Sequence, residues 1–363
     1  MKKVLFVAST EIHILHFHIP YIKAFKELGW EVHVACGNSK GLLEEADRCV
    51  SLPFEKKMYS LRNFACARRL RREIKAHKYD LMLCHTSLAA FFARFAVLGM
   101  KNRPAVCNMV HGYLFDDESS WIKRTVLSLA ERITAPVTDL ILTMNRYDTD
   151  YAKAHKLAKR VACVNGIGLN CQKQKADINL REQLGIGEER FLCLYAAEFS
   201  KRKSQHVLIK ALTMLPENVV LLLPGNGDLL EECRQLAKEL GVEERVVFPG
   251  YVSGVGKWYS SVDAAVSSSR SEGLPFNIME AMHYALPIVA SSVKGHTDLI
   301  EDSVSGFLYP YGDSAACAEK IRILVESQEC AEKIGKAAEE KVQSYRLENV
   351  LPTVMEYYLA TKK

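Results

Sequence analysis

Short apolar runs alternate with longer amphipathic stretches along almost the whole chain. The runs are rich in Val, Ile and Leu and carry no alternating polar residues, as expected for parallel strands that are covered on both faces. Helical patterns between them include Leu61–Lys78, Ser204–Leu215, Leu229–Leu240 and Ala315–Ser327. This alternation predicts an α/β fold. The strands are expected at Lys3–Ala8, Glu31–Cys36, Asp80–Cys84, Ala105–Val110, Asp139–Met144, Val161–Val164, Arg190–Ala196, Val219–Leu223, Arg245–Phe248, Asp263–Ser267 and Pro287–Ala290.

The alternation restarts near residue 190, after a stretch that is poor in bulky apolar residues. This stretch, Asn165–Glu189, contains four glycines and is predicted to be a linker. A length of 363 residues also favours about two domains. We therefore expect two doubly wound, Rossmann-like domains facing a central cleft, which would be lined by the loops that follow the carboxyl ends of the strands.

The cysteine pattern and the hydropathy favour a cytoplasmic protein. The eleven cysteines include no Cys-x-x-Cys pair, which indicates reduced thiols and argues against a structural zinc site. No segment reaches the roughly 18–20 continuous apolar residues of a membrane span. The apolar run that begins at Val4 is too short for a signal peptide and is predicted to be a buried first strand.

Charge is distributed unequally along the chain. Residues 1–175 carry 28 Lys and Arg against 16 Asp and Glu, whereas residues 176–363 carry 20 against 27. A basic half joined to an acidic half suggests that the two halves contact different partners.

Two nucleotide-binding fingerprints are incomplete. Gly254–Lys257 resembles the end of a P-loop, but Trp258 stands where that motif needs Ser or Thr. Gly166–Cys171 lacks the third glycine of a dinucleotide-binding turn. Both observations weaken the hypotheses of a P-loop NTPase and of an NAD-dependent dehydrogenase.

The segment Ser271–Met282 carries the strongest functional signal. It follows a predicted strand, and Pro275 suits the first turn of a helix because that position needs no N–H donor. Free N–H groups at Gly273 and Leu274, together with the helix dipole, would form an anion site. Glu272 and Glu280 would flank that site and could bind sugar hydroxyls. A surface helix with two solvated glutamates is the alternative.

This segment resembles the Glu-x7-Glu signature of retaining, family-four glycosyltransferases with the GT-B fold. Other segments resemble motifs of the same family, in the same order and over nearly the whole chain, especially those of bacterial capsular and exopolysaccharide transferases. They are the first-strand loop Thr10–Pro20, the His-Gly-aromatic motif Val110–Phe115, the linker Gly166–Asn170, the stretch Lys294–Ile300 and a hairpin at Gly306–Leu308.

A basic loop, Ala197–Gln205, is expected after the first strand of the second domain. Its cations Arg202 and Lys203 could hold a diphosphate, Arg through a bidentate fork and Lys as a point charge. Lys203 matches the lysine of the family, and Arg202 would replace the arginine of a Gly-Arg pair that is here Ala197-Glu198. Which cation contacts which phosphate stays open, and a solvated loop is the alternative.

The remaining donor-site residues follow from the resemblance. Gly225 and Gly227 match a Gly-x-Gly loop close to the nucleotide, although a tight turn explains them almost as well. Tyr251 would frame the base. Pro275 and Phe276 would complete the donor site at the start of the helix.

Three histidines are assigned to the transferred sugar and the acceptor. His111 follows a predicted strand, and the resemblance implies that it contacts the transferred sugar or stabilises the transition state. His13 and His85 are expected on the acceptor side. The spacing of His13, His16 and His18 is a poor metal motif without a fixed helix or a carboxylate, so no metal is expected.

A basic helix is a candidate membrane contact. It contains only one acidic residue, and it lacks the stacking aromatics expected of a nucleic-acid site. A solvated face is the alternative. We predict contact with an anionic membrane surface, because acceptors of this family are often polyprenyl-diphosphate-linked. The cations are Arg68, Arg69, Arg71, Arg72, Lys75 and Lys78.

The sequence therefore predicts a retaining glycosyltransferase with an acceptor-binding domain at 1–170 and a nucleotide-sugar domain at 171–345. The helix within 346–363 would pack back on the first domain. The expected reaction moves a hexose or N-acetylhexosamine from a UDP-sugar to a saccharide acceptor, without a metal or other cofactor. The cytoplasmic enzyme would attach to the inner face of the plasma membrane. The alternatives are a GT-B-fold sugar-nucleotide epimerase or hydrolase, and a non-catalytic partner subunit.

Overall fold

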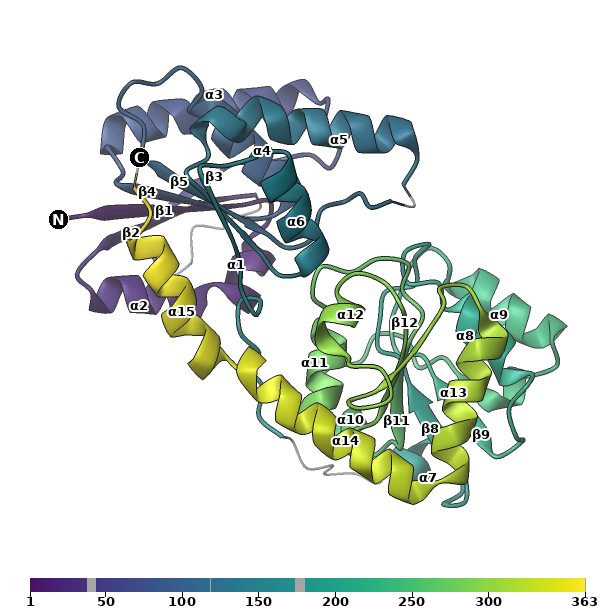
Figure 1. Ribbon diagram of the computed structural model, residues 1–363. Coiled ribbons are helices and arrows are strands. Elements are labelled where there is room, and N and C mark those ends of the chain that lie inside the picture. The colour runs from purple at the N-terminus through teal and green to yellow at the C-terminus, as the bar shows by residue number, and fades with distance from the viewer. Residues whose placement is uncertain (38–43, 118, 174–179, 363) are drawn as a thin grey trace. The chain divides into compact units, whose positions relative to one another are not determined.

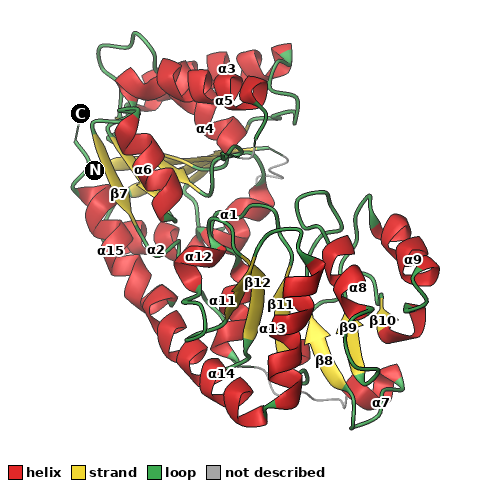
Figure 2. Ribbon diagram, turned by 45° about the vertical axis from the view of Figure 1, so that its right-hand side comes forward, coloured by secondary structure: helices red, strands yellow, loops and turns green. Residues whose placement is uncertain are grey.

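A computed structural model describes residues 1–37, 44–117, 119–173 and 180–362 (Figure 1). The chain forms two compact units, of which unit 1 comprises Met1–Gly168 with Glu348–Lys363 and unit 2 comprises Leu169–Leu347. Each unit contains one parallel sheet with helices on both faces (Figure 2). Residues 174–179 of the predicted linker lie outside the described residues.

The sheet of unit 1 has seven parallel strands in the order β3-β2-β1-β4-β5-β6-β7. The strand order reverses at β1, so the loops after β1 and β4 diverge at this point and leave space for a ligand. The edge strand β3 was not predicted. Only Val50 of this strand is buried, so the strand has no continuous apolar run. The strands are β1 Lys3–Ala8, β2 Glu31–Cys36, β3 Arg48–Ser51, β4 Leu81–Cys84, β5 Ala105–Val110, β6 Leu140–Thr143 and β7 Arg160–Cys163.

Helices cover both faces of this sheet. α3 and α4 lie on one face, and α2 and α15 lie on the other (Figure 1). Tyr358 of α15 is buried, and its ring centroid lies 6.1 Å from that of Tyr21 and 6.3 Å from that of Phe25. The helices are α1 Glu11–Phe17, α2 Ile19–Glu27, α3 Leu61–His77, α4 Ser87–Ala96, α5 Trp121–Thr134, η1 Ala135–Val137, α6 Arg146–Ala154 and α15 Leu347–Leu359.

The sheet of unit 2 has six parallel strands in the order β10-β9-β8-β11-β12-β13. The hairpin expected at Gly306–Leu308 is wrong, because Phe307–Tyr309 pairs in parallel with β12. A Cβ on Gly306 would lie 2.9 Å from Ile300 and 3.0 Å from Ile288, so a glycine lets this strand enter the sheet. The strands are β8 Phe191–Leu194, β9 Val219–Leu222, β10 Val246–Val247, β11 Ala264–Ser267, β12 Ile288–Ser291 and β13 Phe307–Tyr309.

The helices of unit 2 also form two layers. α8 packs against α9 and α13, whereas α11 packs against α10 and α14. The helix predicted over Ser204–Leu215 is shorter than expected, because Ser204 has a φ of 51° and cannot join a right-handed helix. The helices are α7 Leu180–Leu184, α8 His206–Leu212, α9 Leu230–Glu239, η2 Glu243–Arg245, α10 Gly256–Tyr259, α11 Phe276–His283, α12 His296–Leu299, α13 Ser314–Glu326, α14 Gln328–Val342 and η3 Gln343–Tyr345.

Candidate functional site

A carboxylate on the loop after β11 holds both predicted diphosphate-binding cations. Arg202 donates from Nη1 to Oε2 of Glu272 over 2.7 Å, and Lys203 donates from Nζ to Oε1 over 2.6 Å. Ser269 donates to the same Oε1 over 2.6 Å. Burial alone would raise the pKa of Glu272, but the charges of Lys203 and Arg202 outweigh it and lower the pKa to about 2. Glu272 is therefore a buried carboxylate at neutral pH.

The two cations differ in their access to a ligand. The Arg202 side chain is 49% exposed, whereas that of Lys203 is 12% exposed. Burial lowers the pKa of Lys203 despite the opposing charge of Glu272. Arg202 can therefore turn towards a bound anion, whereas Lys203 is fixed beside the loop that precedes α11.

A pocket of about 350 Å³ lies in unit 2. Its walls come from the loops that follow β8, β9 and β10 and from one side of α11. Three predicted donor-site residues line it, namely Gly225, Tyr251 and Glu280, and Glu198 and Asn277 were not predicted. Asn277 lies one turn before Glu280 on α11, so the two side chains share one side of the helix and both line the pocket.

Glu280 is the main titratable group of this pocket. Burial raises the pKa of its carboxyl group to about 7. Within the described ranges, the Glu280 side chain has no hydrogen-bond or ion-pair partner. A carboxylate in this position can accept hydrogen bonds from two neighbouring hydroxyl groups of a ligand.

The glycines of the loop after β9 serve the packing of the protein itself. A Cβ on Gly225 would lie 2.0 Å from the carbonyl oxygen of Ala197, and one on Gly227 would lie 2.2 Å from that of Phe199. Their φ values of 150° and 152° are also unfavourable for other residues. The structure therefore requires glycine at these positions because the loop after β8 lies so close.

α11 begins one residue later than the sequence suggests. Pro275 is the N-cap, so Phe276 is the first helical residue and Pro275 does not lie in the first turn. Leu274 is buried before the cap. A Cβ on Gly295 would lie 2.9 Å from the carbonyl oxygen of Gly273, so the stretch before α12 packs closely on the Glu272–Gly273 loop.

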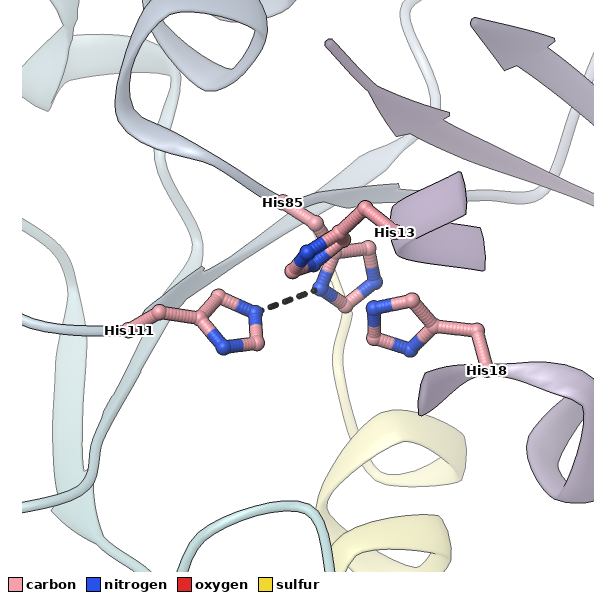
Figure 3. Close-up of side chains that lie close together, drawn as sticks. All are labelled: His13, His18, His85 and His111. Carbon is pink, nitrogen blue, oxygen red and sulfur yellow. Dashed lines mark hydrogen bonds between the residues drawn. The ribbon is translucent and has the colours of Figure 1, made fainter. Parts of the chain in front are cut away.

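In unit 1, the fold brings the predicted histidines together. His85 follows β4, His111 follows β5, and His13 lies on α1 (Figure 3). Nε2 of His111 lies 3.4 Å from Nδ1 of His85, and the ring centroids of His13 and His111 are 4.8 Å apart. His18 also belongs to this group of side chains. The sequence analysis considered it only together with His13 and His16.

The segment expected to be the first-strand loop is mostly helical. Thr10 caps α1 by accepting a hydrogen bond from the backbone N–H of His13, and α2 follows directly. His13 and His16 are therefore fixed on a helix, contrary to expectation, but His16 is exposed and lies outside the cluster.

The predicted basic helix is α3, and it contains one exception. Arg68, Arg69, Arg72 and Lys75 are exposed, as is Lys78 after the helix. Arg71 instead donates from Nη1 to the carbonyl oxygens of Ala96 and Leu98, so it stabilises the end of α4 and is not free to face a membrane.

An exposed apolar face on α5 was not predicted from the sequence. Its large side chains are exposed, with Trp121 at 76%, although they would ordinarily be buried. Their spacing indicates an amphipathic helix, but the sequence cannot show that this face lacks a partner. The side chains are Trp121, Ile122, Val126, Leu129 and Ile133.

Among the helices of the described ranges, none has the length and hydropathy to cross a bilayer.

Comparison with known proteins defines the class of the chain. Its two parallel sheets are those of the GT-B glycosyltransferases. A model of the Glycosyltransferase Family 4 matches residues 12–167, and a model of the Glycosyl transferases group 1 matches residues 177–341.

The chain belongs to the glycosyltransferase family that these two models describe. It is 33% identical to a protein named as glycosyltransferase EpsD of Bacillus subtilis (strain 168), over 92% of this chain and 90% of that protein. It is 23% identical to the UDP-Gal:alpha-D-GlcNAc-diphosphoundecaprenol alpha-1,3-galactosyltransferase of Escherichia coli, over 66% of this chain and 65% of that enzyme. Anabaena HepE, solved with UDP and glucose, has the same fold with a TM-score of 0.81 and 22% identity, over 98% of this chain and 99% of HepE.

Proposed function

We propose that the protein is a retaining glycosyltransferase that moves a hexose or N-acetylhexosamine from a UDP-sugar to a lipid-linked saccharide in surface polysaccharide biosynthesis. The main observation is the unpartnered Glu280 carboxylate in a pocket of unit 2 that also contains Tyr251. UDP in the structure of HepE and the diphosphoundecaprenol acceptor in the name of the E. coli enzyme support the choice of donor and acceptor.

The uridine of the donor would occupy this pocket. Tyr251 is exposed at its rim and can stack on the base, and Glu280 would accept hydrogen bonds from the two ribose hydroxyls. Binding would thereby provide partners for a carboxylate whose ionisation burial makes costly. This pairing favours a nucleoside over a simple sugar in the pocket.

The diphosphate would be held by Arg202, Lys203 and the N-terminal end of α11. Glu272 neutralises part of the positive charge of the two cations. The negative charge of the donor diphosphate would neutralise the rest. During transfer the bond from the anomeric carbon to the diphosphate breaks, and negative charge builds up on the leaving oxygen. The two cations and the helix dipole would stabilise that charge, which is why the proposal needs no metal at the diphosphate.

The acceptor would react on the same face of the sugar that the diphosphate leaves. Its oxygen forms the new bond to the anomeric carbon while its proton passes to a diphosphate oxygen, so no residue acts as a covalent nucleophile. Glu272 would contact the donor hexose. His111 would contact the transferred sugar, and His13 and His85 are proposed on the acceptor side.

A membrane surface would present the lipid-linked acceptor. The exposed cations of α3 would attract anionic lipid headgroups, and the apolar face of α5 would enter the interface between headgroups and acyl chains. This proposal places the protein at the inner face of the plasma membrane.

A transfer assay separates this proposal from its alternatives. Purified protein would be incubated with labelled UDP-sugars, with and without a lipid extract. We expect label in the lipid fraction and free UDP only when extract is present. Turnover without extract would instead indicate an epimerase or hydrolase. If UDP binds but nothing turns over with any sugar or extract, the protein is a non-catalytic subunit.

A further inference from the structure

Four histidine side chains converge in unit 1, at the point where the strand order of the sheet reverses. His13 lies on α1, His18 is the N-cap of α2, and His85 and His111 follow β4 and β5 (Figure 3). One imidazole nitrogen from each residue lies within 4.8 Å of the corresponding nitrogens of the other three. His13 and His18 are neighbours on the α1–α2 segment, but His85 and His111 are far from them in the sequence, so only the fold creates this cluster.

Several of these imidazole nitrogens are buried without a partner. Within the described residues, His18 has no hydrogen bond at either ring nitrogen, and neither Nε2 of His13 nor Nε2 of His85 has one. His18 and His85 are fully buried. Buried polar atoms are nearly always hydrogen-bonded, so four unpartnered nitrogens in one cluster point to a missing ligand.

The chemistry of the cluster indicates what that ligand is. All four side chains are imidazoles, and a neutral imidazole offers one lone pair to a metal ion. Several such nitrogens without thiolates form the donor set that suits zinc, copper, nickel and iron.

We propose that His13, His18, His85 and His111 bind one divalent transition-metal ion, with Zn²⁺ as the expected occupant. With Zn–N bonds of about 2.0–2.1 Å, neighbouring ligand atoms of a tetrahedral site lie about 3.3 Å apart. Nε2 of His111 and Nδ1 of His85 are 3.4 Å apart, close to this edge, and the hydrogen bond between them would give way to the ion. The wider pairs must move closer when the ion binds.

The ion would attach the α1–α2 segment to the carboxyl ends of β4 and β5. It would fix His111, His13 and His85, which are assigned above to the sugar and the acceptor. The proposed diphosphate site contains none of the four residues. The inference therefore stands on unit 1 alone and does not depend on the proposed function.

A second group of possible ligands provides a control. His33, Glu73 and His77 also lie close together, but their side chains already have partners. His33 is bonded to Tyr79 and Glu31, and Glu73 is bonded to Arg48. This group therefore lacks the unpartnered nitrogens that indicate an absent ion.

Metal titration tests the inference on the full chain. Protein treated with a chelator would be titrated with Zn²⁺ by equilibrium dialysis and with Co²⁺ by visible absorption. We expect one ion per chain and the intense bands of tetrahedral Co²⁺. His18→Ala and His85→Ala should each lower the affinity by roughly 100-fold or more, since even the loss of an outer partner of a ligand costs about 10–100-fold. His16→Ala and His77→Ala should leave the affinity unchanged.

Two results would overturn the inference. One is wild-type protein that binds neither ion, and the other is binding that His18→Ala and His85→Ala leave intact or that His77→Ala removes. Cooperative urea unfolding of each variant reports whether unit 1 is folded, and UDP affinity, a property of unit 2, should not change with metal. If either variant fails to fold, X-ray absorption of the Zn²⁺-loaded wild type decides, because four nitrogen ligands at about 2.0–2.1 Å are expected and sulfur or mainly water ligands would contradict the site.

Discussion

Nζ of Lys203 lies 2.6 Å from Oε1 of Glu272, and both side chains are almost completely buried. The pair connects the loop after β8 to the loop that precedes α11. Removal of one partner of a buried ion pair strongly destabilises the folded protein, because the other charge is left buried without compensation. In the proposed function the same two residues contact the donor, so we expect stability and activity to depend on this one contact.

Glu272→Gln should lower the free energy of unfolding by about 3 kcal/mol at pH 7. The wild-type pKa is lowered from 4.5 to about 2, so the carboxylate contributes its full stability above pH 4.5 and loses it as the pH falls towards 2. Urea unfolding should therefore show a smaller difference between variant and wild type at pH 3 than at pH 7. Glu198→Gln, at an exposed position of the loop after β8 that also carries Lys203, should change stability little at either pH. An unchanged difference at pH 3 would contradict the ion pair.

Glu280→Gln should have the opposite effect on stability. The wild-type pKa is raised from 4.5 to about 7, so the folded protein loses stability as the pH rises through this interval. The variant should match the wild type at pH 5 and exceed it at pH 8, by an amount on the order of 1–3 kcal/mol. It should also bind UDP more weakly, because an amide replaces the carboxylate that accepts from the ribose. Equal stability at both pH values, or unchanged UDP affinity, would contradict this role.

Arg202→Ala and Lys203→Ala should each weaken UDP binding. Loss of a charge-assisted hydrogen bond costs about 1.5–3 kcal/mol, which corresponds to roughly 10- to 150-fold in affinity. Lys201→Ala is the matched control, since Lys201 is exposed and adjacent but does not contact Glu272. Isothermal titration calorimetry would measure all three. Equal losses in the control and the test variants would indicate only a general effect of charge.

Membrane attachment should have an electrostatic and an apolar component. Arg68→Glu, Arg69→Glu and Arg72→Glu together should remove the salt-sensitive part of co-sedimentation with anionic vesicles, whereas Trp121→Ser with Ile122→Ser should remove the part that persists at high salt. Arg71 is left intact because it holds the end of α4. Reversal of Lys238, Lys333 and Lys336 in unit 2 serves as the control. If wild-type protein ignores anionic vesicles at low salt, the acceptor is soluble.

The sequence predicted most of the fold because central strands have continuous apolar runs. It also singled out Glu272 and Lys203, which the structure joins in an ion pair, since each lies on one short segment of the chain. That these two residues and Glu280 bind the donor stays a prediction. β3 and β13 were missed because an edge strand with one buried residue, or a strand of three residues, has no recognisable period. The contacts of His18 and Arg71 join segments that are distant in the sequence, and no local pattern predicts such contacts.

The most direct test is the anomeric configuration of the transferred sugar. The protein would be incubated with an α-linked UDP-sugar and the lipid-linked acceptor that accepts label, and the product linkage would be determined by proton NMR. The account predicts an α-linked product, formed by the wild type and much more slowly by Lys203→Ala and Glu272→Gln. A β-linked product, or wild-type rates in both variants, would contradict retaining transfer at this site.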